Sequence, residues 1–176
     1  MSTVRAFFAR TGHNPGALLV ATNAKEKMNG RFFEDFALGQ MFYAGPIEMT
    51  AERIKSFATE FDPQPFHMDE AAAQSTLFAG LAASGWHTAA VTMRMLADSG
   101  LNIVGGTIGA GVEELRWPRP VRPGDRLRLE VEVVDLRTSR SRPERGIVKV
   151  RLTTLNQNGD PVQISTPALM VPRRPA

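Results

Sequence analysis

Residues 126–134 read RLRLEVEVV, so that charged and apolar side chains alternate along most of this stretch. Because successive side chains of a strand point to opposite faces, the alternation predicts a β-strand with one buried face and one wet face. Residues 148–152 repeat the pattern, and Asn158-Gly159, a strong hairpin-turn signal, separates them from the apolar stretch 162–170. The last third of the chain therefore predicts antiparallel strands in sequence.

Residues 85–97 predict the longest helix, and Gly100 is well placed to end it. One apolar stripe of this helix consists of Trp86, Ala90, Met93 and Ala97, and beside it lie Ala89, Thr92 and Leu96. A helix that is apolar on so much of its circumference is expected to be central and buried. Together with the strands it predicts an α+β fold, in which an antiparallel sheet wraps around one long helix.

The segment before that helix predicts a strand and two shorter helices. Residues 41–49 suggest a strand bent near Gly45-Pro46. Thr50 can cap a helix, and Asp69 can cap a short one that runs to Gln74. The first of these helices has an apolar stripe at the helical spacing, made by Ile54, Phe57, Ala58 and Phe61.

The composition limits the chemistry that can be proposed. The 176 residues are 43% hydrophobic, which suits one globular domain with a core. Cysteine is absent, which excludes disulfides, a thiolate nucleophile and cysteine metal ligands. The three histidines are dispersed, so we expect neither a metal nor a cofactor.

No apolar run approaches the ~20 residues of a membrane helix, so we expect no membrane span and a cytoplasmic protein. We interpret residues 1–28 as a flexible N-terminal extension or as the product of an upstream start codon. Residues 29–176 are expected to form one domain. Residues 119–151 hold ten basic side chains against five acids. They could bind an anionic ligand or form the wet face of strands, but no interleaved aromatic set favours nucleic acid.

Asp62 and His67 stand five residues apart in the segment Asp-Pro-Gln-Pro-Phe-His. Two prolines in three residues predict a stiff loop without regular structure. Such a loop can aim a carboxylate and an imidazole at one water molecule, and this pair could transfer protons. The alternatives are a histidine bonded to its own loop and a carboxylate that serves a helix end or turn.

Ser84-Gly85 opens the long helix, where backbone N–H groups lack partners and the helix dipole is positive. The Gly85 amide could stabilise the negative charge that develops on a thioester oxygen. The alternatives are packing of the helix start for Gly85 and an N-cap for Ser84.

The segments 62–69 and 77–86 resemble the D-x-N-P-x-H…G motif of the MaoC-like, R-specific enoyl-CoA hydratases. The resemblance implies a hotdog fold, a catalytic pair Asp62 and His67, the Gly85 amide as oxyanion hole, and a homodimer or higher homo-oligomer. It also implies substrate contacts, which we assign to Ser84, Gln64, Arg119 and Arg122, the arginines near the CoA phosphates. Gln64 replaces the family's asparagine, Ser84 stands where histidine often precedes the glycine, and Met93 where some members have serine.

The resulting hypothesis is a hydratase or dehydratase that acts on enoyl or 3-hydroxyacyl thioesters of CoA or a carrier protein. Two alternatives stay open: an acyl-CoA thioesterase on the same scaffold, and a non-catalytic acyl-CoA-binding protein. Free CoA as product would identify the former, and binding without turnover the latter.

Overall fold

The computed structural model describes residues 30–175, so the predicted extension 1–28 lies outside the described residues. One five-stranded antiparallel sheet has the order β1-β3-β4-β5-β2. The elements in chain order are η1 (Phe33–Asp35), β1 (Met41–Met49), α2 (Ala51–Phe61), α3 (Pro65–Met68), α4 (Glu70–Gln74), α5 (Gly85–Asp98), β2 (Ile108–Arg116), β3 (Asp125–Thr138), β4 (Arg145–Leu155) and β5 (Pro161–Pro172). The predicted α+β architecture is confirmed.

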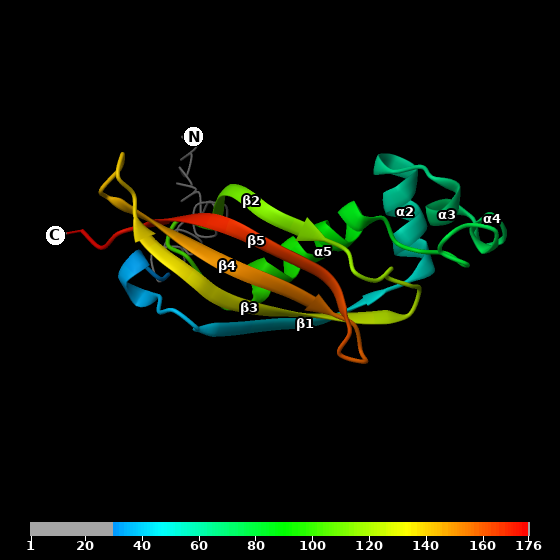
Figure 1. The fold of residues 1–176 in the computed structure, drawn as a ribbon, viewed down its shortest axis with the longest axis horizontal. Coiled ribbons are helices and arrows are strands. Elements are labelled where there is room, and N and C mark those ends of the chain that lie inside the picture. The colour runs from blue at the N-terminus through cyan, green and yellow to red at the C-terminus, as the bar shows by residue number, and fades with distance from the viewer. Residues whose placement is uncertain (1–29, 176) are drawn as a thin grey trace, which may run out of the picture.

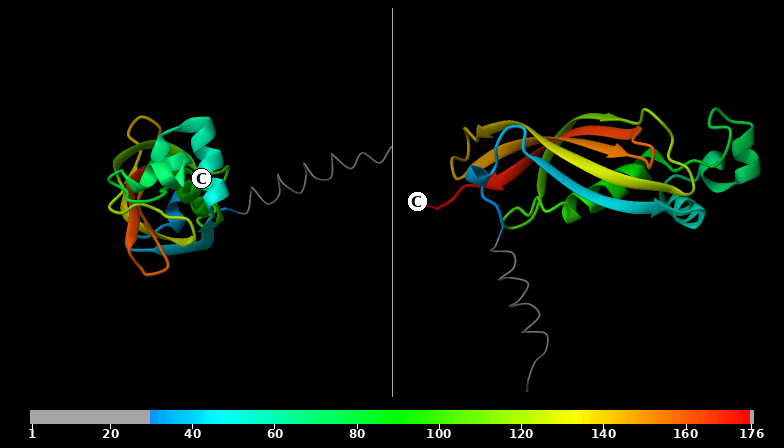
Figure 2. Two further views of the ribbon diagram at one scale, coloured as in Figure 1. Left: turned by 90° about the vertical axis from the view of Figure 1, so that its right-hand side faces the viewer. Right: turned by 90° about the horizontal axis from the view of Figure 1, so that it is seen from below.

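The sheet curves around α5, and the short helices α2, α3 and α4 gather at one end of the molecule (Figures 1 and 2). The inner face of the sheet carries the alternating apolar side chains that the sequence predicted, and they form the core with Met95 and Leu96 of α5. The fully buried sheet residues include Leu127, Val131, Val133, Val148 and Val150. Burying this apolar face is the main force that holds helix and sheet together.

The prediction that α5 is buried around most of its circumference is wrong. Its buried residues are His87, Thr88, Val91, Thr92, Met95 and Leu96. The predicted stripe of Trp86, Ala90, Met93 and Ala97 faces away from the sheet, and Trp86 is 63% exposed and Met93 52% exposed. The physical reason is that a sheet on one side of a helix covers only one face, so this single chain leaves the opposite apolar stripe uncovered.

The strand and helix expected at 41–61 are present. The pairing of β1 with β3 shifts register between Ala44 and Ile47, which places the predicted bend at Gly45-Pro46. The Thr50 hydroxyl accepts a hydrogen bond from the Arg53 amide at 3.3 Å and so caps α2. The predicted stripe of α2 is buried only in part, because Phe61 at the end of the helix is 63% exposed.

The prediction of an irregular loop between Asp62 and His67 is wrong for its second half, which forms α3. Pro65 occupies the first turn of this helix, where a missing N–H costs nothing and a fixed φ angle is already helical. Asp69 caps the next helix as predicted, with the Ala72 amide 2.7 Å from its Oδ1. Within residues 30–175, no helix is long and apolar enough to cross a membrane.

The side chain of His87 on α5 packs against α2, where its ring stacks on Phe57 at a centroid distance of 4.6 Å. The residue is 6% exposed, and its Nδ1 has no hydrogen-bond partner among the described residues. Burial lowers the pKa of His87 to about 4, with a smaller contribution from the positive charge of Arg53. The folded protein therefore holds His87 neutral in a pH range where an unfolded chain would protonate it.

We expect the free energy of unfolding to fall as the pH drops from about 6.5 towards 4, because the unfolded chain there binds a proton that the folded chain excludes. His87→Phe keeps the stacked ring and removes the titration, so its stability should depend less on pH in this window. Urea unfolding of both proteins at several pH values measures the difference. Identical pH slopes would contradict the buried, neutral state of His87.

Candidate active site

The imidazole of His67 is held in one orientation by the chain that follows it. His67 is 5% exposed, and its Nδ1 lies 2.7 Å from the backbone oxygen of Ala82. A carbonyl oxygen can only accept, so Nδ1 must carry the hydrogen of this bond. The other ring nitrogen, Nε2, lies 3.4 Å from Oδ2 of Asp62. The histidine therefore presents to Asp62 the nitrogen that can gain or lose a proton.

Asp62 is the C-cap residue of α2, where the prolines that follow end the helix. Its side chain is 24% exposed, and Oδ2 accepts a hydrogen bond of 2.7 Å from the Ser84 hydroxyl. The same carboxylate oxygen, Oδ2, thus accepts from Ser84 and lies next to Nε2 of His67. A continuous polar chain runs from Ser84 through Asp62 and His67 to Ala82, which ties α2, α3 and the start of α5 together.

The start of α5 supplies the third predicted component. Ser84 is its N-cap, and the hydroxyl accepts from the Trp86 amide at 3.2 Å while it donates to Asp62. Gly85 is the first residue of the helix, so its N–H has no acceptor within the helix. A Cβ at Gly85 would come within 2.7–3.0 Å of three ring atoms of Trp117, so this position must be glycine to accept the indole.

A cavity of about 240 Å³ lies beside His67 and the first turn of α5. Two predicted catalytic residues, His67 and Gly85, line it, together with the predicted substrate residue Arg119. The other lining residues are Phe78, Ala83, Thr88, Trp117, Pro118, Pro120 and Val121. The cavity therefore has an imidazole and a helix N-terminus in its wall, and Asp62 contacts this imidazole at 3.4 Å without being a lining residue itself.

The remaining predicted substrate residues have other surroundings. Ser84 is 1% exposed and contacts Asp62, which makes it a residue that positions the carboxylate. Gln64 is exposed and is the N-cap residue of α3. The guanidinium of Arg122 donates to three backbone oxygens after α4, those of Phe78, Gly80 and Leu81. Arg122 thus holds a loop that forms the cavity wall.

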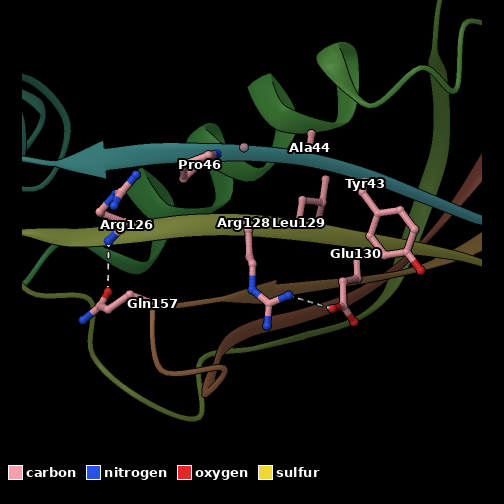
Figure 3. A pocket seen from close by; sticks show the side chains of 9 residues that line it. Tyr43, Ala44, Pro46, Arg126, Arg128, Leu129, Glu130 and Gln157 are labelled. Carbon is pink, nitrogen blue, oxygen red and sulfur yellow. Dashed lines mark hydrogen bonds and ion pairs between the residues drawn. The ribbon is translucent and has the colours of Figure 1, made fainter.

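The basic residues of 119–151 lie largely on the outer face of the strands, where several are paired with acids. These pairs are Arg119 with Asp160, Arg128 with Glu130, Lys149 with Glu113, and Arg151 with Glu132. A larger hollow of about 480 Å³ lies on this face at the bend of β1. Figure 3 shows its lining side chains, which include Arg126 and Arg128 of β3. Its lining contains no histidine and no aspartate, so it lacks the acid–base pair of the smaller cavity.

Some residues of the site were not found from the sequence. The Ala82 oxygen carries no side-chain signal, because its role depends only on where the backbone passes His67. Trp117 also lines the cavity, and its sequence position carries no signal for this role, because a tryptophan near a strand end more often belongs to a core or an interface. Among the described residues, no group of three or more histidine, aspartate or glutamate side chains could hold a metal ion.

Two curated proteins resemble this chain. "Uncharacterized protein YdeM" of Bacillus subtilis is 37% identical over 126 residues, which cover 70% of this chain and 86% of that protein. A mesaconyl-CoA hydratase of Cereibacter sphaeroides is 31% identical over 152 residues, 82% of this chain but 42% of that longer protein.

Solved structures agree with the predicted hotdog fold. A MaoC-like dehydratase from Rhodospirillum rubrum is 55% identical with a TM-score of 0.80, and the match covers 84% of this chain and all of that one. The R-hydratase PhaJ1 of Pseudomonas aeruginosa is 27% identical with a TM-score of 0.64, over 82% of this chain and 88% of that one. The family model of the MaoC like domain matches residues 35–156, more than half of the sequence. The chain therefore belongs to the MaoC-like domain family.

Proposed function

We propose that the protein is a hydratase or dehydratase that interconverts enoyl and 3-hydroxyacyl thioesters, with CoA as the carrier. The observation that carries this proposal is the pair of His67 Nε2 and Asp62 Oδ2, 3.4 Å apart, beside the N-terminus of α5. Such a pair can remove one proton and deliver another, and the helix N-terminus can stabilise a negative oxygen between the two steps.

In the hydration direction, a water molecule in front of the pair attacks C3 of the enoyl thioester. Asp62 takes a proton from this water while the new C3–O bond forms, and the electrons of the C2=C3 bond move towards the thioester oxygen. The Gly85 amide donates a hydrogen bond to that oxygen. Protonated His67 then gives its Nε2 proton to C2, and the proton gained by Asp62 returns to His67. Dehydration follows the same steps in reverse.

The hydrogen bonds around the pair support this division of roles. Because Ala82 keeps a hydrogen on Nδ1, Nε2 is the nitrogen of His67 that is left to exchange a proton. It lies 3.4 Å from Asp62 Oδ2, and His67 lines the cavity. Two of the similar proteins, the mesaconyl-CoA hydratase and the R-hydratase PhaJ1, are hydratases by name. This agrees with hydro-lyase chemistry for the present chain.

We also propose that the protein works as a homodimer. The residues of edge strand β2 are exposed over most of its length, with Ile108 at 49% and Val112 at 59%. The exposed side of α5, with Trp86 and Met93, adds further uncovered apolar surface. A second copy paired along β2 would satisfy the free backbone groups of that edge in a two-fold symmetric way. The cytoplasmic location stays a prediction.

Asp62→Asn and His67→Ala should each lower the rate of crotonyl-CoA hydration, or that of a better enoyl-CoA, by ~100- to 10,000-fold. The measurement follows loss of the conjugated thioester and identifies the product by mass spectrometry. Glu70→Gln is the control, because it removes a nearby carboxylate whose partner is the exposed Lys55. Unchanged rates in the first two variants would reject the assigned roles. Release of free CoA would identify a thioesterase. Tight binding of acyl-CoA without turnover would identify a non-catalytic binding protein.

Ser84→Ala should lower kcat by roughly 10- to 100-fold with little change in KM, because Asp62 loses the group that positions it. It should also cost ~1 kcal/mol of stability through the lost helix cap. Ser84→Thr keeps a hydroxyl and should recover most of kcat. Steady-state kinetics and urea unfolding of both variants separate the two effects. An unchanged kcat in Ser84→Ala would exclude the positioning role.

Val112→Asp should convert a dimer into a monomer, because it places a charge on the apolar part of the β2 edge. Leu77→Asp is the matched control, since Leu77 is 98% exposed and lies outside the strands. Sedimentation velocity of the three proteins gives the result. A monomeric unmodified protein, or a dimer that persists in Val112→Asp, would contradict pairing through β2.

A further inference from the structure

We propose that Trp117, held by Gln163, closes the space between α5 and the sheet and restricts the enzyme to short acyl groups. This inference rests on the proposed function, because it concerns the acyl part of the thioester in the same cavity. It assigns a specificity role to a residue that neither donates nor accepts a proton in the reaction.

The indole of Trp117 is fixed by contacts on different sides. Its Nε1 donates a hydrogen bond of 2.9 Å to Oε1 of Gln163, and Gln163 is 2% exposed on β5. The ring lies against Gly85, where the absence of a Cβ gives it room. Trp86 meets it edge to face at a centroid distance of 5.6 Å. Trp117 is 40% exposed, and these contacts hold the covered part of its ring as a wall beside the predicted oxyanion position.

The space behind this wall is occupied by bonded polar side chains. Thr88, one turn into α5, lines the cavity and is 2% exposed. One further turn along, the Thr92 hydroxyl lies 2.7 Å from that of Thr154 on β4, and both residues are almost fully buried. A long acyl tail between α5 and the sheet would have to displace these groups and break their hydrogen bonds, which costs ~1–3 kcal/mol for each group left unpaired.

The size of the cavity leads to the same conclusion. Its volume of about 240 Å³ lies below the range of ~300–1,000 Å³ that is typical of small-molecule sites. The thioester and the attacking water take part of this volume, because His67 and Gly85 form one side of the cavity. What remains inside the cavity fits an acyl group of a few carbons, such as crotonyl, and leaves the end of an octenoyl chain outside it.

The test compares kcat/KM for crotonyl-CoA and octenoyl-CoA. We expect the unmodified protein to prefer crotonyl-CoA by ~100-fold or more, and Trp117→Ala to reduce this ratio at least ~10-fold by raising the octenoyl value. Tyr43→Ala is the control: it removes an exposed aromatic side chain on β1 that does not line this cavity, and it should keep the ratio. Gln163→Leu retains the bulk but loses the acceptor for Nε1, so it should shift the ratio in the same direction by less.

Equal activity of the unmodified protein on both substrates would overturn the proposal, as would an unchanged ratio in both Trp117→Ala and Gln163→Leu. An equal shift in Tyr43→Ala would also overturn it. Calorimetric binding of butyryl-CoA and octanoyl-CoA, which cannot be hydrated, keeps the test independent of catalysis. If butyryl-CoA binds more tightly and Trp117→Ala removes this preference, the inference stands even when no enoyl thioester is hydrated.

Discussion

The hydrogen bond from Ser84 to Asp62 is the contact on which the site depends. It joins the end of α2 to the beginning of α5, two segments that are 22 residues apart in the chain. The same carboxylate faces His67 on α3, and His67 in turn is oriented by Ala82, just before α5. Ser84 thus orients the carboxylate of Asp62, and Ala82 orients the imidazole of His67. Because Asp62 and Ser84 are helix-cap residues, the ends of α2 and α5 fix their positions, and the proton-transfer pair is held in place before substrate binds.

The fold serves this arrangement by fixing α5. The inner face of the sheet packs on Met95 and Leu96 in the second half of the helix, whereas the first turn lines the cavity and makes polar contacts with Ser84. The same helix thus contributes apolar surface to the core and an unpaired N–H to the site. Its outward stripe, with Trp86 and Met93, is left without a partner in the single chain. A second copy on β2 would account for this surface and for the free strand edge.

Much of this arrangement could be predicted from the sequence because the signals were local. Alternation at 126–134 identified β3, the Asn158-Gly159 turn separated β4 from β5, and Thr50 and Asp69 marked helix starts. Other features depend on tertiary packing. Apolar periodicity alone could not say which face of α5 meets the sheet. The two prolines predicted a loop without regular structure, but Pro65 is the first residue of the helix α3. The positioning role of Ser84 and the wall formed by Trp117 likewise required the structure.

In the proposed reaction, a thioester oxygen lies at the Gly85 amide while Asp62 and His67 converge on one water molecule. A crystal structure of the Asp62→Asn protein with crotonyl-CoA bound tests it most directly. We expect the thioester oxygen within hydrogen-bond distance of the Gly85 nitrogen, with C3 facing residues 62 and 67. A ligand whose acyl group lies elsewhere, such as the hollow between Arg126 and Arg128 on the outer face, would contradict it.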